Sequence, residues 1–152
     1  ARYGSSDRYD LVMDGAAAVT VASLAQAREA AAAAVEFKRR LMLVSVAGQS
    51  GGWFAKLLSL VRGEFTLSVV GILDCGTQPG RVLESLTLPL DGVVFLEAQA
   101  PGGVELGARL RLLLTAAGRA YLVERPAAIS LVRFRATGAA SAHLRREWLK
   151  ND

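Results

Sequence analysis

The sequence contains few of the residues that build disulfides, zinc sites and activated nucleophiles. Its 152 residues include one cysteine, Cys75, and one histidine, His143. A single cysteine cannot form an internal disulfide, and a cysteine-rich zinc site is excluded. A lone thiol is typical of a reducing compartment. We therefore expect the protein in the cytoplasm or in the interior of an organelle.

Long apolar runs are also lacking. The longest uncharged stretches, residues 15–27 and 41–55, are shorter than the roughly 18–20 apolar residues that a membrane span requires. The first ten residues lack the apolar core of a signal peptide. There is no Walker lysine and no full dinucleotide fingerprint. The sequence therefore predicts no membrane span and no cofactor, and no motif in it names a reaction or a metal site.

The chain is rich in hydrophobic residues, and its length is suited to one domain. Hydrophobic residues make up 52% of the chain, which argues against disorder. At this size, roughly 68–70% of the surface of the unfolded chain can be buried, which is enough for a core that needs no disulfides or structural metal ions. We expect a single α/β domain over residues 1–152. Its core should cover about 9–134, followed by a basic C-terminal segment at 135–152.

Short apolar runs recur along the chain and alternate with segments of helical spacing. This alternation predicts βαβ crossovers and a parallel sheet, and continuous apolar runs are typical of strands covered on both faces. We expect a three-layer α/β domain with about five mainly parallel strands. A flavodoxin-like strand order is favoured, and a half-barrel arrangement comes second. The expected strands cover 18–22, 41–46, 65–73, 92–97 and 119–124, with a possible edge strand at 9–14 and a sixth strand at 129–134.

Local signals mark the ends of the expected helices. Ser23 and Gln26 form a capping box before an alanine-rich helix that extends to about Arg40. The later helices are expected at 53–62, from 79 to before 89, at about 104–117, and at 139–150. The expected inward face of the helix at 104–117 consists of Leu106, Leu110, Leu113 and Leu114.

The loop at residues 48–52 follows an expected strand and opens a helix. It matches G-x-S-x-G, the nucleophile elbow of serine hydrolases, and Asp74 or Asp91 and then His143 follow in hydrolase order. Against this, Asp91 precedes its strand and nothing in the sequence fixes the orientation of His143. A plain glycine turn is one alternative. Another is an anion site on the amides at the helix start, for which the candidate residues are Gly48, Ser50, Gly51 and Gly52.

In an open parallel sheet, ligands bind beyond the carboxyl ends of the strands. Asp74 and Cys75 follow one expected strand, and Glu97 and Glu124 end the next two. Three converging carboxylates could hold Mg²⁺ or act as acid and base. The alternative is that charged residues mark the points where buried strands reach water. Because no histidine is near it in sequence, Cys75 is expected to be a buried structural thiol rather than a nucleophile.

Positive charge gathers near the C-terminus. The formal net charge is +4, and five basic and two acidic residues from position 131 onward contribute +3 of it. The same segment contains the aromatic residues Phe134 and Trp148. Basic and aromatic side chains together are suited to docking onto a protein partner or, with weaker support, to binding a nucleic-acid backbone. The remaining alternative is an ordinary terminal helix packed on its own sheet. The partner-binding candidates are Phe134, Arg135, Leu144, Arg145, Arg146 and Trp148.

Two classes of function follow. The first is a non-catalytic interaction or assembly protein that uses the C-terminal segment and helix faces to bind a protein partner or a second copy. The second is a small-ligand or anion-binding domain, or a modest enzyme, with a site at the carboxyl edge; the fold class cannot choose between them. We also expect Leu43 and Val70 in central strands. The loops at 48–52 and 74–76 should lie side by side, because right-handed crossovers place them at one edge.

Overall fold

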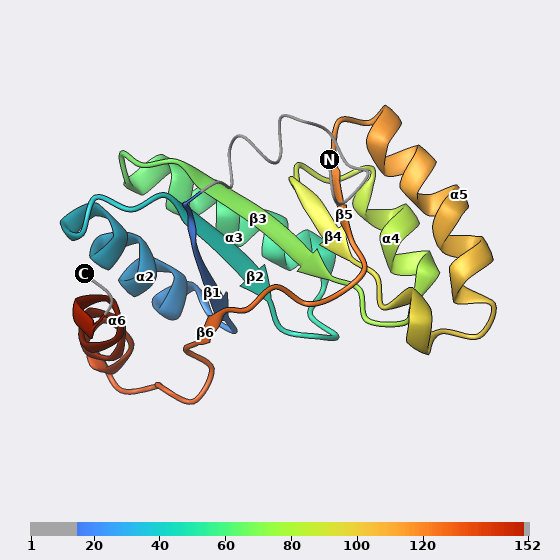
Figure 1. Cartoon of the computed structure of the whole chain (residues 1–152). Coiled ribbons are helices and arrows are strands. Elements are labelled where there is room, and N and C mark those ends of the chain that lie inside the picture. Colours follow the sequence, from blue (N-terminus) through green and yellow to red (C-terminus); the bar gives the residue numbers. More distant parts are fainter. Residues whose placement is uncertain (1–14, 151–152) are drawn as a thin grey trace.

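The computed structural model describes residues 15–150 as an α/β fold with one sheet (Figure 1). The expected edge strand at 9–14 lies outside the described residues. The strands are β1 (Ala17–Val21), β2 (Leu41–Ser45), β3 (Val69–Asp74), β4 (Gly92–Val94), β5 (Ala120–Leu122) and β6 (Ile129–Ser130). The helices are α2 (Leu24–Glu36), α3 (Gly51–Glu64), α4 (Pro79–Ser85), α5 (Gly103–Ala116) and α6 (Ala139–Lys150), with a short 3-10 helix, η1 (Glu97–Gln99), after β4.

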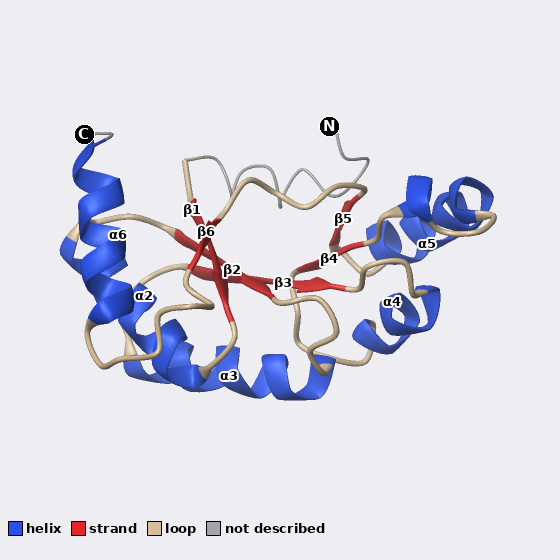
Figure 2. Cartoon of the chain, turned by 90° about the horizontal axis from the view of Figure 1, so that it is seen from below, coloured by secondary structure: helices blue, strands red, loops and turns tan. Residues whose placement is uncertain are grey.

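The strand order is β5-β4-β3-β2-β1-β6, and all neighbouring strands are parallel. The predicted α/β class and parallel sheet are confirmed. The favoured flavodoxin-like order is wrong, because β1 to β5 follow one another in a single direction, as in the half-barrel alternative. Right-handed crossovers that all move in one direction place their helices on one face. Figure 2 accordingly shows α2 to α5 along the outer side of a curved sheet.

The other face of the sheet is apolar as well. It carries a second buried cluster made of Met42, Val44, Val70, Ile72, Val94, Leu96, Ala120 and Leu122. No described helix lies over this face. Instead, the connection between β5 and β6, residues 123–128, crosses it (Figure 2). The strands are therefore apolar on both faces, as predicted, and the three layers are the helices, the sheet and this connection.

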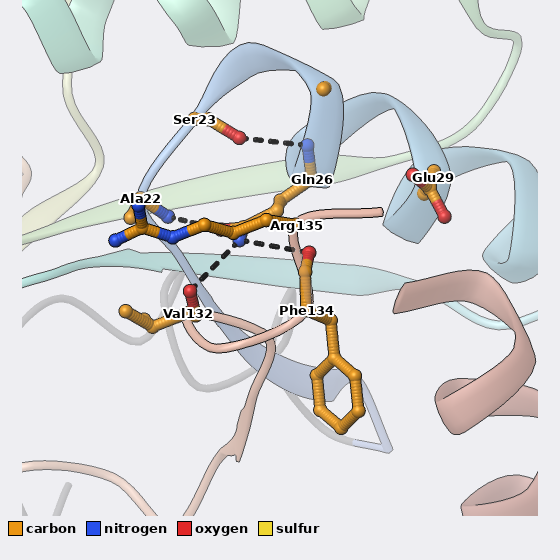
Figure 3. A pocket seen from close by; sticks show the side chains of 8 residues that line it. Ala22, Ser23, Gln26, Glu29, Val132, Phe134 and Arg135 are labelled. Carbon is orange, nitrogen blue, oxygen red and sulfur yellow. Dashed lines mark hydrogen bonds between the residues drawn. The ribbon is translucent and has the colours of Figure 1, made fainter. Parts of the chain in front are cut away.

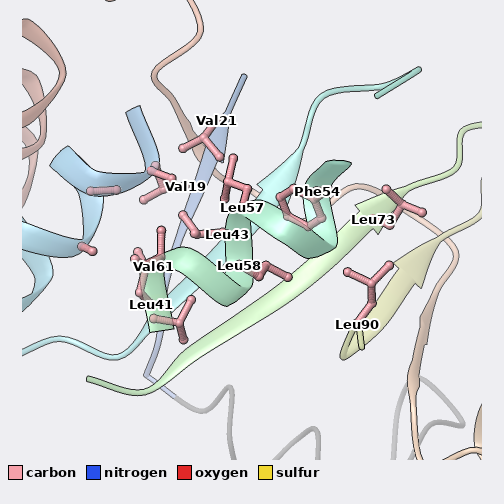
Figure 4. Packing of buried hydrophobic residues seen from close by; sticks show 14 of the residues in the cluster. Val19, Val21, Leu41, Leu43, Phe54, Leu57, Leu58, Val61, Leu73 and Leu90 are labelled. Atoms are coloured by element: carbon pink, nitrogen blue, oxygen red, sulfur yellow. The ribbon is translucent and has the colours of Figure 1, made fainter. Parts of the chain in front are cut away.

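The larger core cluster lies between the sheet and the helices (Figure 4). Leu43 is fully buried in β2, and Val70 is 6% exposed in β3, so both predicted central positions are confirmed. Leu58 of α3 packs closely on β3, because a Cβ added at Gly71 would lie only 2.0 Å from Leu58 Cδ1. Glycine at this position lets α3 approach the sheet.

The inward face of α5 is narrower than predicted. Leu110 and Leu114 are buried and Leu106 is partly buried, but Leu113 is 47% exposed. The other buried positions of the helix are Gly103 and Gly107. Since α5 lies at the end of the helical layer beside the edge strand β5 (Figure 2), only a thin stripe of it is covered. The leucines outside that stripe face away from the core.

The terminal helix α6 is confirmed and packs beside α2 (Figure 1). Ala140, Leu144 and Trp148, four residues apart and so on one helix face, belong to the main core cluster. The core therefore continues through α6 instead of ending near residue 134. Burial of α2 by both the sheet and α6 explains its small residues, of which Ala27, Ala30, Ala31, Ala33 and Ala34 are buried.

None of the helices in the described part of the chain has both the length and the hydropathy needed to cross a bilayer.

Candidate functional site

The loops after β2 and β3 lie next to each other at the carboxyl edge of the sheet, as predicted. The parallel pairing of β2 with β3 places both strand ends there. Arg81 of α4 joins the two loops. Its Nη1 donates to the Asp74 carbonyl at 3.2 Å, and its Nη2 donates to the Gln49 carbonyl. Arg81 therefore holds the two candidate loops together with its own guanidinium.

The glycine loop has structural roles at most of its positions. Gly48 has a φ of +84°, a conformation that favours glycine. A Cβ on Gly51 would lie 2.9 Å from Leu88 Cδ1 and 3.2 Å from Leu73 Cδ2, so a larger residue there would displace these side chains. Ser50 caps α3, because its Oγ accepts a hydrogen bond from the Trp53 amide at 3.3 Å. Gly52 is exposed in the first turn of the helix.

The residues of the hydrolase interpretation do not come together. His143 lies on α6, where its ring stacks on Phe134 with a centroid distance of 4.5 Å. Helix α6 lies beside α2, away from Ser50 at the start of α3 (Figure 1). Asp91 lies at the amino edge of the sheet, where it accepts from the Gly71 amide at 2.8 Å. The G-x-S-x-G match is thus a glycine turn and a helix cap without a base.

Asp74 is buried, and its charge is balanced within the chain. Its Oδ1 accepts from the Gly76 amide at 2.9 Å, and its Oδ2 pairs with Arg125 Nε at 2.5 Å. Its own amide donates to the Oγ of buried Ser45 at 2.9 Å. Since Arg125 belongs to the connection between β5 and β6, this ion pair fastens that connection to the end of β3.

Glu97 and Glu124 do not converge on Asp74. Glu97, in η1, accepts a hydrogen bond from the Tyr121 hydroxyl at 2.7 Å. Burial, together with this hydrogen bond, raises the pKa of Tyr121. Glu124 is exposed. Within residues 15–150, no group of three or more His, Cys, Asp or Glu side chains is placed to hold a metal ion.

Cys75 is 1% exposed, and burial raises the pKa of its thiol to about 12. The thiol is therefore protonated at neutral pH, whereas nucleophilic attack requires the thiolate. Cys75 is thus buried, as expected.

Two of the C-terminal partner-binding candidates are internal, which corrects the prediction for them. Leu144 is fully buried and Trp148 is 2% exposed. The Trp148 ring meets Phe37 edge to face at 5.6 Å, and the Arg39 guanidinium lies 5.2 Å from its centroid. The apolar stripe of α6 is real, but α2 of the same chain covers it.

The other C-terminal candidates lie at or near the surface. Arg145 pairs with Glu36 at 2.9 Å, and Arg146 is exposed. Phe134 is partly buried between the His143 ring and the Arg133 guanidinium, which lies 4.8 Å from the Phe134 centroid.

Arg135, the remaining candidate, lines a pocket of about 320 Å³ beyond the carboxyl end of β1 (Figure 3). One wall is the start of α2, and the other is the segment from Val132 to Arg135. Gln26 joins the two walls: its Nε2 donates to the carbonyls of Val132 at 3.2 Å and Phe134 at 3.3 Å.

Only part of this arrangement could be predicted from the local sequence pattern. The capping box is confirmed, since Ser23 Oγ accepts from the Gln26 amide at 3.1 Å. The Gln26 side chain also reaches back, but its Oε1 accepts a hydrogen bond from the amide of Ala22, one residue before the Ser23 cap, at 2.8 Å. Its contacts with residues more than a hundred positions away depend on β6 pairing with β1, for which the sequence carries no local signal.

No protein-family model matches this chain, and no curated protein matches it either. Function is therefore inferred from the residues and their geometry alone.

Proposed function

We propose that the protein is a non-catalytic interaction protein that assembles with a second copy of itself through the outward face of α5. The state of the candidate reactive groups supports a non-catalytic role. Asp74 is neutralised by Arg125, Ser50 caps a helix, and Cys75 is a buried, protonated thiol. The lone buried thiol is also typical of a protein that works in the cytoplasm or in an organelle interior.

The observation that carries the proposal is an exposed apolar stripe on α5. Leu112 is 72% exposed, Val104 is 66% exposed, and Leu113 beside them is 47% exposed. Val104, Ala108 and Leu112 are spaced four residues apart and so share one helix face. Contiguous exposed apolar side chains mark interaction sites, whereas single ones are ordinary. Helix α5 ends the helical layer, and no described element covers its outer side (Figure 2).

The charges beside the stripe favour a second copy as the partner. Glu105 and Arg109 are both exposed and lie one turn apart. In an antiparallel pair of α5 helices with a two-fold axis near Ala108, Glu105 of each copy lies beside Arg109 of the other. Opposite charges at the rim of an apolar contact fix its register. A self-complementary patch of this kind is the basis of two-fold dimers, the commonest symmetric assembly.

The C-terminal segment supports assembly less well than α5 does. Its two apolar anchors, Leu144 and Trp148, are used inside the chain. Lys150 is ion-paired with Glu147 at 2.8 Å, as Arg145 is with Glu36. These pairs also weaken the case for nucleic acid as the partner, because charges already neutralised release fewer counterions from a phosphate backbone.

Sedimentation equilibrium of the wild type and Leu112→Glu tests the proposal. Burying one leucine is worth about 1.5–3 kcal/mol. Two copies of Leu112 enter a two-fold interface, so the variant should weaken the dimer by about a hundredfold or more. Leu149→Glu is the matched control, because Leu149 on α6 is 63% exposed. A wild type that stays monomeric at all concentrations, or equal effects of the two variants, would contradict the α5 interface.

A further inference from the structure

We infer that a groove containing Arg133 and Arg135 binds a small ligand that carries a phosphate group. The groove consists of the pocket of Figure 3 and a second hollow of about 610 Å³. The two share Val132 and Arg135 in their walls, and Arg133 and His143 line the second hollow. We call this pair of hollows the arginine groove. It lies at the opposite end of the sheet from α5, so the inference does not depend on the proposed dimer.

Hydrogen bonds within the chain hold the backbone of the segment that carries the two arginines. Gln26, which is 4% exposed, donates to the carbonyls of Val132 and Phe134 on either side of Arg133. The Leu131 amide donates to the Thr20 carbonyl at 2.9 Å, which holds the segment against β1. A rigid segment loses little conformational entropy on binding. The groove is therefore preorganised on its arginine side.

The charges in the groove are not balanced within the described chain. Arg133 and Arg135 form no ion pair among residues 15–150. The two carboxylates in the lining are already engaged. Glu29 accepts from the Ser141 amide at 3.0 Å, and Glu147 pairs with Lys150. The Ser141 amide is neutral, so Glu29 keeps its negative charge, and the two arginines leave the lining with a net charge of +1. An anionic ligand is therefore favoured, and a phosphate monoester supplies about −1.5 to −2 at neutral pH.

The shape of the arginine side chain fits the same class of ligand. A guanidinium presents a planar fork of donors that binds phosphate oxygens in pairs. Arg135 is exposed and lines both hollows of the groove, and its side chain extends toward Ala22 in the view of Figure 3.

Titration of ¹⁵N-labelled protein with pyrophosphate at low ionic strength tests the inference. Pyrophosphate should shift the amide resonances of residues 132–135 in the wild type. Arg135→Gln should weaken binding by about tenfold or more, because a hydrogen bond to a charged group is lost. Arg135→Lys keeps the positive charge but loses the planar pair of donors, so its affinity for pyrophosphate should lie between those of the wild type and Arg135→Gln. Lys56→Gln, which removes an exposed charge on α3, should change the affinity less than about twofold.

Three results would overturn the inference. The first is a wild type whose 132–135 amides do not respond to pyrophosphate. The second is equal weakening by Arg135→Gln and Lys56→Gln, which would mean non-specific attraction to a basic surface. The third is citrate binding as tightly as pyrophosphate, which would remove the preference for phosphate over carboxylate. Because the Arg135 side chain is exposed, its variants should melt like the wild type, and melting curves check this.

Discussion

Replacing Trp148 with alanine tests whether α6 is part of the core of the domain or is instead free to bind a partner. The ring is 2% exposed and contacts Phe37 and Arg39. A buried tryptophan removes about 150–250 Å² from water, worth about 4–6 kcal/mol at 25 cal/mol per Å². Residual compactness of the unfolded chain lowers such sums by about 10–40%. We therefore expect a loss of about 3–5 kcal/mol, the range found when large aromatic residues in cores are truncated.

Urea unfolding followed by far-UV circular dichroism measures this loss without relying on the fluorescence of the residue removed. All variants should be compared at one protein concentration. The matched control is Leu149→Ala, since the neighbouring Leu149 side chain is 63% exposed. It should change the free energy of unfolding by less than about 0.5 kcal/mol. A Trp148→Ala variant that unfolds within about 1 kcal/mol of the wild type but associates more weakly would refute the internal packing of α6.

Four further variants, one of them a control, test the core and the buried thiol. Leu43→Ala, at a fully buried position of a central strand, should cost about 2–4 kcal/mol in chemical unfolding. Gly107→Ala should cost about 1–3 kcal/mol, because its Cβ would lie 1.9 Å from Glu97 Oε2, whereas Gly80→Ala, with open space around its Cβ, should be near neutral. The Cys75 thiol has a pKa of about 12 when folded and about 8.5 when unfolded. Its contribution to stability is therefore complete below about pH 8.5 and falls by up to about 1.4 kcal/mol per pH unit as the pH rises toward the folded pKa. Cys75→Ala should remove this part of the alkaline slope in denaturation curves measured at several pH values.

The alternation of strands and helices could be predicted because each element carries its own signal. Ser23 and Gln26 mark a helix start, and buried strands such as β3 read as continuous apolar runs. The strand order could not be predicted in this way. Each crossover chooses a direction that no local pattern encodes, and strands that are apolar on both faces are compatible with helices on one side or on both. Only the paired register shows that β1 to β5 proceed in one direction.

The edge of the sheet where the candidate loops meet could be predicted, but the state of its residues could not. Parallel topology alone places the Ser50 and Asp74 loops together. Their partners are Arg81 on α4 and Arg125 in the connection to β6. Sequence spacing does not show that these arginines reach the loops, so a neutralised carboxylate looks the same in the sequence as a free one.

The apolar stripe of α6 shows a similar limit. The spacing of Leu144 and Trp148 predicts one apolar helix face, and that face exists. Spacing does not say whether the surface that covers it belongs to the same chain. In the structure, the covering surface is α2 of the same chain, because the small alanine side chains of α2 leave room for α6 to pack against it.

The most direct test of the α5 interface is disulfide cross-linking of an Ala108→Cys variant. A two-fold axis near residue 108 brings the two Ala108 positions within the roughly 7 Å between Cα atoms that a disulfide allows. The native Cys75 does not interfere, since it is buried with a raised pKa. Ala32→Cys, at an exposed helical alanine of α2, is the control. Mild oxidation should convert Ala108→Cys to a covalent dimer on a non-reducing gel and leave Ala32→Cys monomeric. Equal cross-linking of the two variants, or none of Ala108→Cys, would contradict assembly through α5.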